Sequence, residues 1–516
     1  MALLRSIATV GSYTMISRVL GFARDIMIAA ALGAGPVADA FFVAFKLPNF
    51  FRRLFAEGAF NAAFVPQFTR HMAEGGVANA RRFAEEVLSV FVVTLFLFVT
   101  ALQIAMPWVM QGFAPGFVDD PQRYDLAVTL ARITFPYLLF ISLVSQLGGV
   151  LNAIGRFAAA AATPIILNLC LIAALVGLTP VLPTPGHALA WGVSVAGIAQ
   201  FLWLMRACRK AELTIRLPRP RLTPRVRRFL VLMLPGAIGA GVVQVNLLVD
   251  VVIASFLPGG SVSFLYYADR VNQLPLGVVG VAVGTALLPL LSRQVREGAE
   301  AAANASTNRA IEFSLLLTVP GAAALLVVAG PIVSVLFERG AFGAAETAAT
   351  AAALGAYAVG LPAYVLIKVL GPGFFAREDT TTPVKIAAFC VALNLALNLA
   401  LMGPLHHVGI ALATAVSAWV NAGLLGWLLI RRGHFRPDGR LRRAVPRLVL
   451  ASAAMAALIW FAFGALGGAA GADPVRNALA LAVIVALGLG SFAVFALLFG
   501  AASAADLKRM LDRSRR

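Results

Sequence analysis

Eight charged side chains lie in or at the ends of the first two apolar segments of the sequence: Arg18, Arg24, Asp25, Asp39, Lys46, Arg52, Arg53 and Glu57. A charged side chain at the centre of a membrane costs about 2.5–3.5 kcal/mol unless it faces a water-filled cavity or a partner of opposite charge. Eight charges within forty residues are not the pattern of lipid-facing helices. They predict a polar cavity between the helices.

The chemistry that such a cavity favours is the binding of an oxyanion. Guanidinium groups are always charged and bind phosphate or pyrophosphate through paired hydrogen bonds. The candidate substrate-binding residues are Arg18, Arg24, Arg52 and Arg270. The residues expected to support the cavity or its gating are Ser17, Asp25, Asp39, Glu57 and Asp269.

Internal ion pairing is the structural alternative for each arginine. It would join Arg24 to Asp39, Arg52 to Glu57 and Arg270 to Asp269, while Lys46 and Arg53 extend to the cytoplasmic surface. Pairing cannot neutralise the whole set, because the cations outnumber the acids. The second half of the chain contributes far fewer cations, so the cavity is expected to be lined mainly by the N-terminal lobe.

The elements that position these residues are transmembrane helices. Of the 516 residues, 60% are hydrophobic and only 13% are charged, and the mean hydropathy is +0.88. A soluble protein typically has about 25% charged residues, so a soluble fold is excluded. Alternating ten-residue segments typical of a membrane β-barrel are absent. We predict an all-α polytopic membrane protein.

Apolar runs predict fourteen spans, near residues 8–33, 36–60, 87–112, 126–151, 158–181, 188–206, 229–257, 263–291, 312–336, 347–371, 384–402, 408–430, 448–468 and 477–501. The even-numbered loops hold most of the loop Lys and Arg, with nine basic residues between 206 and 228. Cytoplasmic loops are enriched in these residues, so both termini are predicted to be cytoplasmic. The net charge of +19 reflects this distribution, and no nucleic acid partner is expected.

An internal repeat relates the two halves of the chain at an offset of about 220 residues. Val65-Pro66 with Arg70 matches Leu288-Pro289 with Arg293, and Gly155-Arg156 matches Ala376-Arg377. Six spans per copy place both copies in the same orientation, related by a pseudo-twofold axis along the membrane normal. The predicted domains are an N-terminal lobe at 1–220, a C-terminal lobe at 221–435, and two additional spans with a cytoplasmic tail at 436–516.

Oxygen ligands for a small cation are a weaker signal. Asp250, Asn394 and Asn398 lie within predicted spans, and the two asparagines are four residues apart. Hydrogen bonding between helices is the more common role of such residues. Cys170, Cys208 and Cys390 have no metal-type spacing, and no phosphate-binding loop for ATP is present.

Four motifs resemble the MurJ (MviN) family of the multidrug/oligosaccharidyl-lipid/polysaccharide exporter superfamily. They are Ser17–Asp25 (SRVLGFARD), Ala38–Asn49 (ADAFFVAFKLPN), Arg52–Phe60 (RRLFAEGAF) and Tyr266–Arg270 (YYADR). The resemblance covers essentially the full chain. It implies a lipid II flippase, not an enzyme, which moves undecaprenyl-pyrophosphoryl-disaccharide-pentapeptide across the bacterial inner membrane by alternating access for peptidoglycan synthesis. Expected partners are lipid II, membrane phospholipid and cell-wall synthesis proteins.

The resemblance also assigns roles to residues. It implies that Arg24, Arg52 and Arg270 contact the pyrophosphate or disaccharide, and that the last two spans hold the polyprenyl tail. It maps a sodium site to Asp250, Asn394 and Asn398, although asparagines stand where a second carboxylate is expected. A separate departure is Gln273 in the eighth predicted span, where some members carry an acid. Sodium, protons and membrane voltage remain alternative driving forces.

Other functions are the alternatives to a lipid II flippase. A related exporter of drugs or of another polyprenyl-linked saccharide is the first. A membrane-embedded glycosyltransferase or pyrophosphatase would need catalytic carboxylates or metal ligands near the outer face. Asp119, Asp120 and Asp125 form the outward acidic cluster there, and their pattern is typical of a solvated loop.

Overall fold

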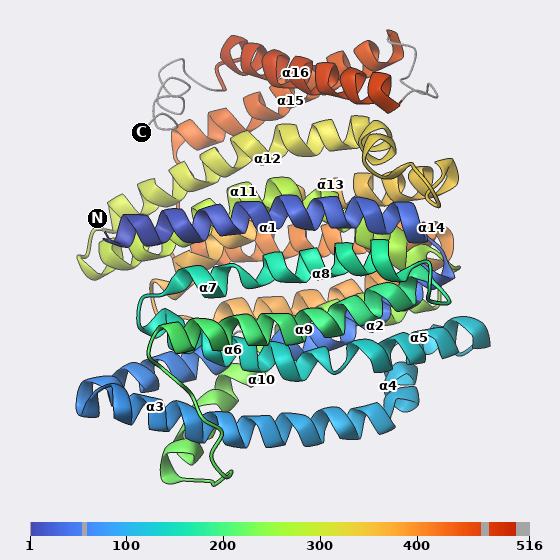
Figure 1. The fold of residues 1–516 in the computed structure, drawn as a ribbon. Coiled ribbons are helices and arrows are strands. Elements are labelled where there is room, and N and C mark those ends of the chain that lie inside the picture. Colours follow the sequence, from blue (N-terminus) through green and yellow to red (C-terminus); the bar gives the residue numbers. More distant parts are fainter. Residues whose placement is uncertain (1, 54–58, 466–473, 502–516) are drawn as a thin grey trace. The chain divides into compact units, whose positions relative to one another are not determined.

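The computed structural model describes residues 2–53, 59–465 and 474–501, and its regular elements there are helices (Figure 1). The chain divides into two compact units, residues 1–263 with 339–342, and residues 264–338 with 343–516. Several helices begin where the sequence provides a side-chain cap followed by proline. Asp120, Thr184 and Thr223 each accept a hydrogen bond from a backbone N–H three residues later.

The first unit contains α1 (Ala2–Leu32), α2 (Pro36–Arg52), α3 (Ala59–Ile104), α4 (Met106–Phe113), η2 (Pro115–Phe117), α5 (Pro121–Thr134), α6 (Tyr137–Ala153), α7 (Phe157–Ala161), α8 (Thr163–Leu178), α9 (Pro185–Lys210) and α10 (Pro224–Ser255). Helix α8 packs between α1 and α9, as the three neighbouring ribbons in Figure 1 show. Phe60 and Phe64 lie one turn apart on α3 with ring centroids 5.2 Å apart, and both contact Phe229 of α10. This aromatic core joins α3 to α10.

The second unit contains most of α11 (Ser261–Arg296), then α12 (Glu300–Phe337), α13 (Ala344–Phe375), α14 (Thr381–Arg431), α15 (Gly439–Ala465) and α16 (Pro474–Leu498). Helix α14 reverses direction at His406, whose φ of 49° and ψ of −131° interrupt the helix. The predicted eleventh and twelfth spans are therefore the two arms of a hairpin within α14.

Nine helical stretches among the described residues are long and apolar enough to cross a membrane. They are Ala63–Ile104, Pro121–Ala153, Phe157–Leu178, Pro185–Lys210, Glu300–Phe337, Ala344–Phe375, Thr381–Arg431, Gly439–Ala465 and Val475–Leu498. The stretch Thr381–Arg431 accounts for two predicted spans, so the nine correspond to ten. The all-α polytopic class is confirmed, whereas the count of fourteen stays a prediction.

The four remaining predicted spans coincide with α1, α2, α10 and α11. Helix α2 is only 17 residues long, and α1 carries Arg18, Arg24 and Asp25 along its middle. The side chains at 235–243 and 245–247 in α10 and at 278–285 in α11 lie outside the description. The division of the chain at residues 220 and 435 also remains a prediction.

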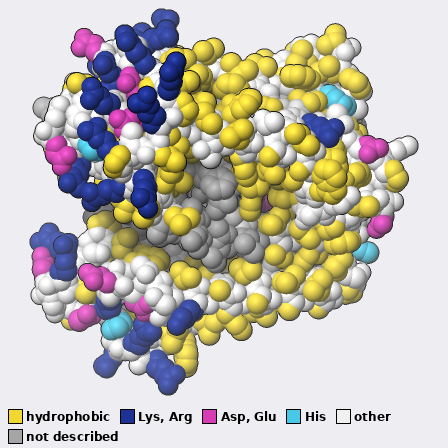
Figure 2. Space-filling model, turned by 90° about the horizontal axis from the view of Figure 1, so that it is seen from below, with side chains coloured by type: hydrophobic (Ala, Val, Ile, Leu, Met, Phe, Trp, Pro, Cys, Tyr) yellow, Lys and Arg dark blue, Asp and Glu magenta, His cyan; other side chains and the backbone are white. Residues whose placement is uncertain are grey.

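Hydrophobic side chains cover much of the molecular face in Figure 2, and most of the Lys and Arg in that view gather at its left side. Large apolar side chains are exposed on helix after helix, among them Trp108, Leu202, Leu399 and Phe461. A water-soluble protein would not expose so many, because each would remain in contact with water. The protein is therefore a multi-pass membrane protein.

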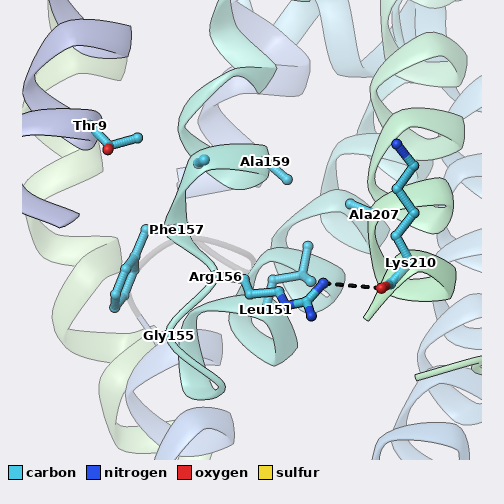
Figure 3. Close-up of a pocket in the computed structure, with 9 residues that line it drawn as sticks. Thr9, Leu151, Gly155, Arg156, Phe157, Ala159, Ala207 and Lys210 are labelled. Atoms are coloured by element: carbon cyan, nitrogen blue, oxygen red, sulfur yellow. Dashed lines mark hydrogen bonds between the residues drawn. The ribbon is translucent and has the colours of Figure 1, made fainter. Parts of the chain in front are cut away.

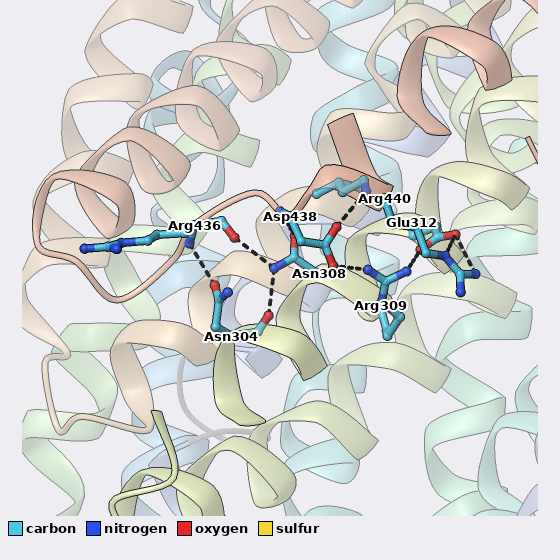
Figure 4. A network of polar contacts seen from close by, with 8 residues as sticks. Asn304, Asn308, Arg309, Glu312, Arg436, Asp438 and Arg440 are labelled. Atoms are coloured by element: carbon cyan, nitrogen blue, oxygen red, sulfur yellow. Dashed lines mark hydrogen bonds and ion pairs between the residues drawn. The ribbon is translucent and has the colours of Figure 1, made fainter. Parts of the chain in front are cut away.

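A polar network fixes the start of α15 to α12 within the second unit (Figure 4). The buried amide of Asn308 donates to the Arg436 carbonyl at 3.0 Å and accepts from the Asp438 N–H at 3.0 Å. Arg309 forms ion pairs with both Glu312 and Asp438. Burial raises the pKa of Asp438, but the Leu441 N–H and the Arg309 guanidinium outweigh it and hold this pKa below its usual range.

Apolar contacts continue this attachment along α15 and α16. Val328 of α12 packs with Met455, Ile459 and Ile484. A Cβ on Gly488 would lie 2.9 Å from Ile459 Cδ1, so a glycine allows α16 to approach α15 closely. Gly490 does not act in this way, because a Cβ there would meet no atom within 4 Å.

Candidate functional site

Arg24 is buried on α1 and is held by two polar side chains. Its Nε and Nη2 donate to Asp25 Oδ1 at 3.0 and 2.6 Å, and its Nη1 donates to Asn168 Oδ1 of α8 at 2.8 Å. Both charged residues are less than 10% exposed. The predicted alternative partner of Arg24, Asp39, was therefore wrong, and the partner of Arg24 is its neighbour in the sequence.

Ser17, Gly21 and Arg24 lie at helical spacing along α1, and Asn168 of α8 lies against this part of the helix. The Asn168 amide donates to the Ser17 carbonyl at 2.9 Å, and a Cβ on Gly21 would lie 3.4 Å from the same nitrogen. Sequence reasoning missed Asn168. Asn168 could have been found as the one carboxamide in the apolar run 164–178, because a polar side chain at membrane depth needs a hydrogen-bond partner.

Asp39 is fully buried near the start of α2 and binds four donors. Its Oδ2 accepts from Arg123 Nη2 at 2.6 Å and from the Gly260 N–H at 2.7 Å. Its Oδ1 accepts from the N–H and the hydroxyl of Ser263 at 2.8 and 2.5 Å. We name these four residues, Asp39, Arg123, Gly260 and Ser263, the Asp39 cluster. It ties α2 and α5 to the turn that begins α11.

Asp119, Asp120 and Asp125 are exposed, in agreement with a solvated acidic cluster, but Arg123 between them is buried. Asp120 caps α5 and Pro121 starts it, so Arg123 falls in the first helical turn and points inward. The guanidinium is 5% exposed, lies 3.8 Å from the centroid of the Phe117 ring, and donates to the Leu257 carbonyl. A basic residue among the acids of an outward loop was the sequence feature that could have indicated a buried ion pair at Arg123.

The other predicted cations of α1 and α2 differ in exposure. Arg18 is exposed, Lys46 and Arg52 are half-buried, and Arg53 is exposed. Glu57 lies outside the described residues, so the alternative pairing of Arg52 with Glu57 stays a prediction.

Arg270 lies in the second unit and contacts an aromatic side chain of its own helix. Its Nη2 donates to the Tyr266 hydroxyl at 2.9 Å, and its guanidinium carbon lies 4.9 Å from the centroid of the Tyr266 ring. Asp269 Oδ2 accepts from the Gln273 amide one turn later. Gln273, the noted departure from some relatives, therefore supports Asp269 as a hydrogen-bond donor.

Asn394 and Asn398 are buried neighbours in the first arm of α14. The Asn398 amide donates to Asn394 Oδ1 at 3.0 Å, and the Asn394 amide contacts Thr414 Oγ1 of the second arm at 3.4 Å. These contacts are the hydrogen bonding between helices that was the alternative to a cation site. Asp250 belongs to the first unit, and the described residues contain no group of three His, Cys, Asp or Glu suited to a metal ion.

Comparison with known proteins identifies the family. The family model described as "Lipid II flippase MurJ" matches residues 28–469. The chain belongs to the MurJ family. A MurJ relative from Rhizobium meliloti, named "Probable lipid II flippase MurJ", is 48% identical over 524 residues that cover 99% of this chain and 97% of the relative. "Lipid II flippase MurJ" of Burkholderia cenocepacia is 37% identical over 463 residues, covering 89% and 90% of the two chains.

Solved structures agree with membership of the MurJ family. "Lipid II flippase MurJ, inward closed conformation" has a TM-score of 0.79 and 26% identity, and the match covers 95% of this chain and 98% of that chain. An inward-facing MATE transporter of the MOP superfamily has a TM-score of 0.66 at 14% identity, covering 83% and 98% of the two chains. The second likeness concerns the fold alone. The MurJ family predicted from the motifs is confirmed.

Proposed function

We propose that this protein is a lipid II flippase of the bacterial cytoplasmic membrane. It carries undecaprenyl-pyrophosphoryl-disaccharide-pentapeptide from the inner to the outer leaflet by alternating access, and so supplies peptidoglycan synthesis. The observation that carries the proposal is the family match over residues 28–469. Buried Arg24 of α1 and half-buried Lys46 and Arg52 of α2 support it, because a diphosphate headgroup needs cations at membrane depth. A transporter of this kind needs no catalytic group.

Depletion of the protein in its host tests this function directly. Lipid II on the outer leaflet is then measured by its accessibility to an externally added enzyme. Outer-leaflet lipid II should fall while total lipid II rises. Unchanged accessibility after complete depletion would contradict the proposal.

We infer the orientation from the loop charges. The basic segment 206–228 begins at the C-terminal end of α9. The acidic residues Asp119, Asp120 and Asp125 lie at the start of α5, where the chain enters the predicted fourth span from the other side of the membrane. By the positive-inside rule, both termini face the cytoplasm. Labelling of single cysteines placed at residue 219 and at residue 119 checks this, and outside labelling at residue 219 would overturn it.

Arg24, Arg52 and Arg270 are proposed to bind the pyrophosphate or disaccharide, with Arg18 at the edge of the site. Guanidinium groups suit this role because their fork of N–H donors matches phosphate oxygens. Asp25, Asp39 and Asp269 then hold arginines or turns in place. The hydrogen bonds of Asp25 to Arg24 and of Asp39 to Arg123 support this division of roles.

The polyprenyl tail is proposed to lie along α15 and α16. Trp460 and Phe461 of α15 are 61% and 67% exposed, and Leu489 of α16 is 71% exposed. The network of Figure 4 anchors this pair to α12, so its apolar surface keeps a fixed place in the second unit. A long apolar chain needs such a surface continuous with the bilayer, because it cannot enter a wet cationic cavity.

Bulky residues on α15 should therefore block transport in a chain-length-dependent way. Ala453→Trp and Ala457→Trp change two exposed alanines one turn apart on α15. We expect at least a fivefold loss in reconstituted flipping of the natural long-chain substrate and little loss for a short-chain analogue. Ala173→Trp on α8, also an exposed alanine, is the matched control. Equal losses for both chain lengths would leave only a structural role for α15.

A sodium ion is proposed to bind between the two arms of α14. Asn394 and Asn398 supply amide oxygens, Thr414 supplies a hydroxyl, and the Ile410 carbonyl lies 3.0 Å from that hydroxyl. These neutral oxygen donors fit a monovalent cation better than a divalent one, which favours carboxylates. Bound sodium would supply the coupling charge of the transport cycle.

Sodium should then stabilise the purified protein. Replacing potassium chloride with sodium chloride is expected to raise the thermal midpoint by several degrees, since a ligand that binds only the folded state stabilises it. Asn398→Ala should abolish this difference, whereas Asn304→Ala at the edge of the Figure 4 network should retain it. Equal midpoints in both salts would favour protons or voltage as the driving force.

A further inference from the structure

A pocket of about 350 Å³ lies in the first unit where α6 ends and α9 ends (Figure 3). It is lined by Thr9, Leu151, Gly155, Arg156, Phe157, Ala158, Ala159, Ala207 and Lys210. Its volume is within the range of small-molecule sites, about 300–1,000 Å³. None of the roles proposed above uses these residues.

The charged residues of the lining are both cations. Arg156 and Lys210 are exposed, and no carboxylate of the described residues forms an ion pair with either. Arg156 Nη1 donates to the Lys210 carbonyl at 3.1 Å, which holds the guanidinium at the pocket (Figure 3). Capping α9 in this way occupies one of the five N–H donors of Arg156. The other donors remain available to an oxyanion.

An exposed tryptophan beside the pocket indicates the depth of the membrane interface. Trp203 of α9 is 43% exposed, and its indole N–H donates to the carbonyl of Ala159, a pocket residue, at 3.1 Å. Exposed tryptophans concentrate at the level of the lipid headgroups. Trp203, Ala207 and Lys210 are spaced four and three residues apart, so they share one face of α9. Along that face the Trp203 indole comes first and the Lys210 ammonium last. An acyl chain would lie at the level of the indole and its charged headgroup at the level of the ammonium.

We propose that this pocket binds the phosphate of an anionic phospholipid in the cytoplasmic leaflet, such as phosphatidylglycerol. Arg156 and Lys210 contact the phosphate oxygens, and Phe157 and Trp203 lie against the upper acyl chains. The apolar lining distinguishes a lipid from free phosphate, because a soluble anion gains nothing from Leu151 and Phe157. The loop charges of 206–228 place this end of α9 on the cytoplasmic side.

Native mass spectrometry of the full-length protein tests the site, with phosphatidylglycerol and phosphatidylcholine as probes. The unaltered protein should bind phosphatidylglycerol about tenfold or more tightly than phosphatidylcholine. The double variant Arg156→Gln with Lys210→Gln should bind phosphatidylglycerol about 10- to 30-fold more weakly, because it removes two interfacial cations. It should therefore lose most of this preference. The control, Arg219→Gln with Arg221→Gln, removes the same charge from an exposed segment outside the pocket and should stay within about twofold.

Two further measurements keep the proposal open to contradiction. Arg156→Lys retains the charge but not the guanidinium fork, so it should weaken phosphatidylglycerol binding by a few fold. This variant replaces the double variant as the test if the double variant does not fold. Millimolar inorganic phosphate should not displace the lipid. Equal lipid binding by the double variant, equal loss in the control, or displacement by free phosphate would each overturn the proposal.

Discussion

The double variant Arg24→Met with Asp25→Leu is expected to fold and insert but to lose transport of lipid II by at least 100-fold. It removes a buried ion pair and its guanidinium together, and replacing such a pair by apolar side chains of similar volume is often neutral for stability. Arg24→Ala alone should instead destabilise the protein by about 3–5 kcal/mol, because it leaves Asp25 buried without its cation. Thermal unfolding separates the two variants, and reconstituted flipping measures their transport.

This comparison separates a binding role of Arg24 from a structural one. Arg24 already has partners in Asp25 and Asn168, so loss of activity in a single variant proves little. If Arg24 only joins α1 to α8, the apolar double variant keeps its activity. The matched control is Arg70→Met with Glu74→Leu, which removes an exposed ion pair of 2.7 Å on α3. It should change neither stability nor transport, since exposed pairs contribute about 0–1 kcal/mol.

The sequence predicted which residues share a helix face but not which helix lies opposite. Ser17, Gly21 and Arg24 are separated by four and three residues, and Asn394 and Asn398 by four, so helical periodicity alone puts each set on one helix face. The partner of Arg24 on α8 is 144 residues away in the sequence, and the partner of Asp39 on α5 is 84 residues away. Nothing in a single sequence specifies such pairings. Asp39 was therefore assigned the wrong cation, Arg24 in place of Arg123.

Arg123 was missed for a related reason. Charge counting treated every residue between two apolar runs as loop, although Asp120 and Pro121 mark the start of a helix at this point. A cap followed by proline would have placed Arg123 in the first turn of α5, where one side faces the protein. The class of the fold was easier to predict, because length and hydropathy alone require membrane-spanning helices.

Asp39→Ala is expected to destabilise the protein by about 3–5 kcal/mol and to stop transport. The change leaves the Arg123 guanidinium buried without a carboxylate, and it leaves the N–H groups of Gly260 and Ser263 without their acceptor. Ser263→Ala should cost only about 1 kcal/mol, because its backbone N–H still reaches Asp39. Thermal unfolding of the three proteins in detergent should give this order.

The double variant Asp39→Leu with Arg123→Met tests whether charge or helix capping dominates the Asp39 cluster. It removes the unpaired cation of Arg123 but leaves the N–H groups of Gly260 and Ser263 without an acceptor. It should therefore recover only part of the stability lost in Asp39→Ala. Full recovery would show that capping of the α11 turn contributes little. The distinction bears on transport, because Ser263 is the last residue of the first unit before the chain enters the second. The whole Asp39 cluster lies in the first unit, so its carboxylate fixes the turn from which the chain leaves that unit. Asp39→Asn, which keeps the shape and one acceptor oxygen, should therefore reduce the flipping rate more than its modest loss of stability explains.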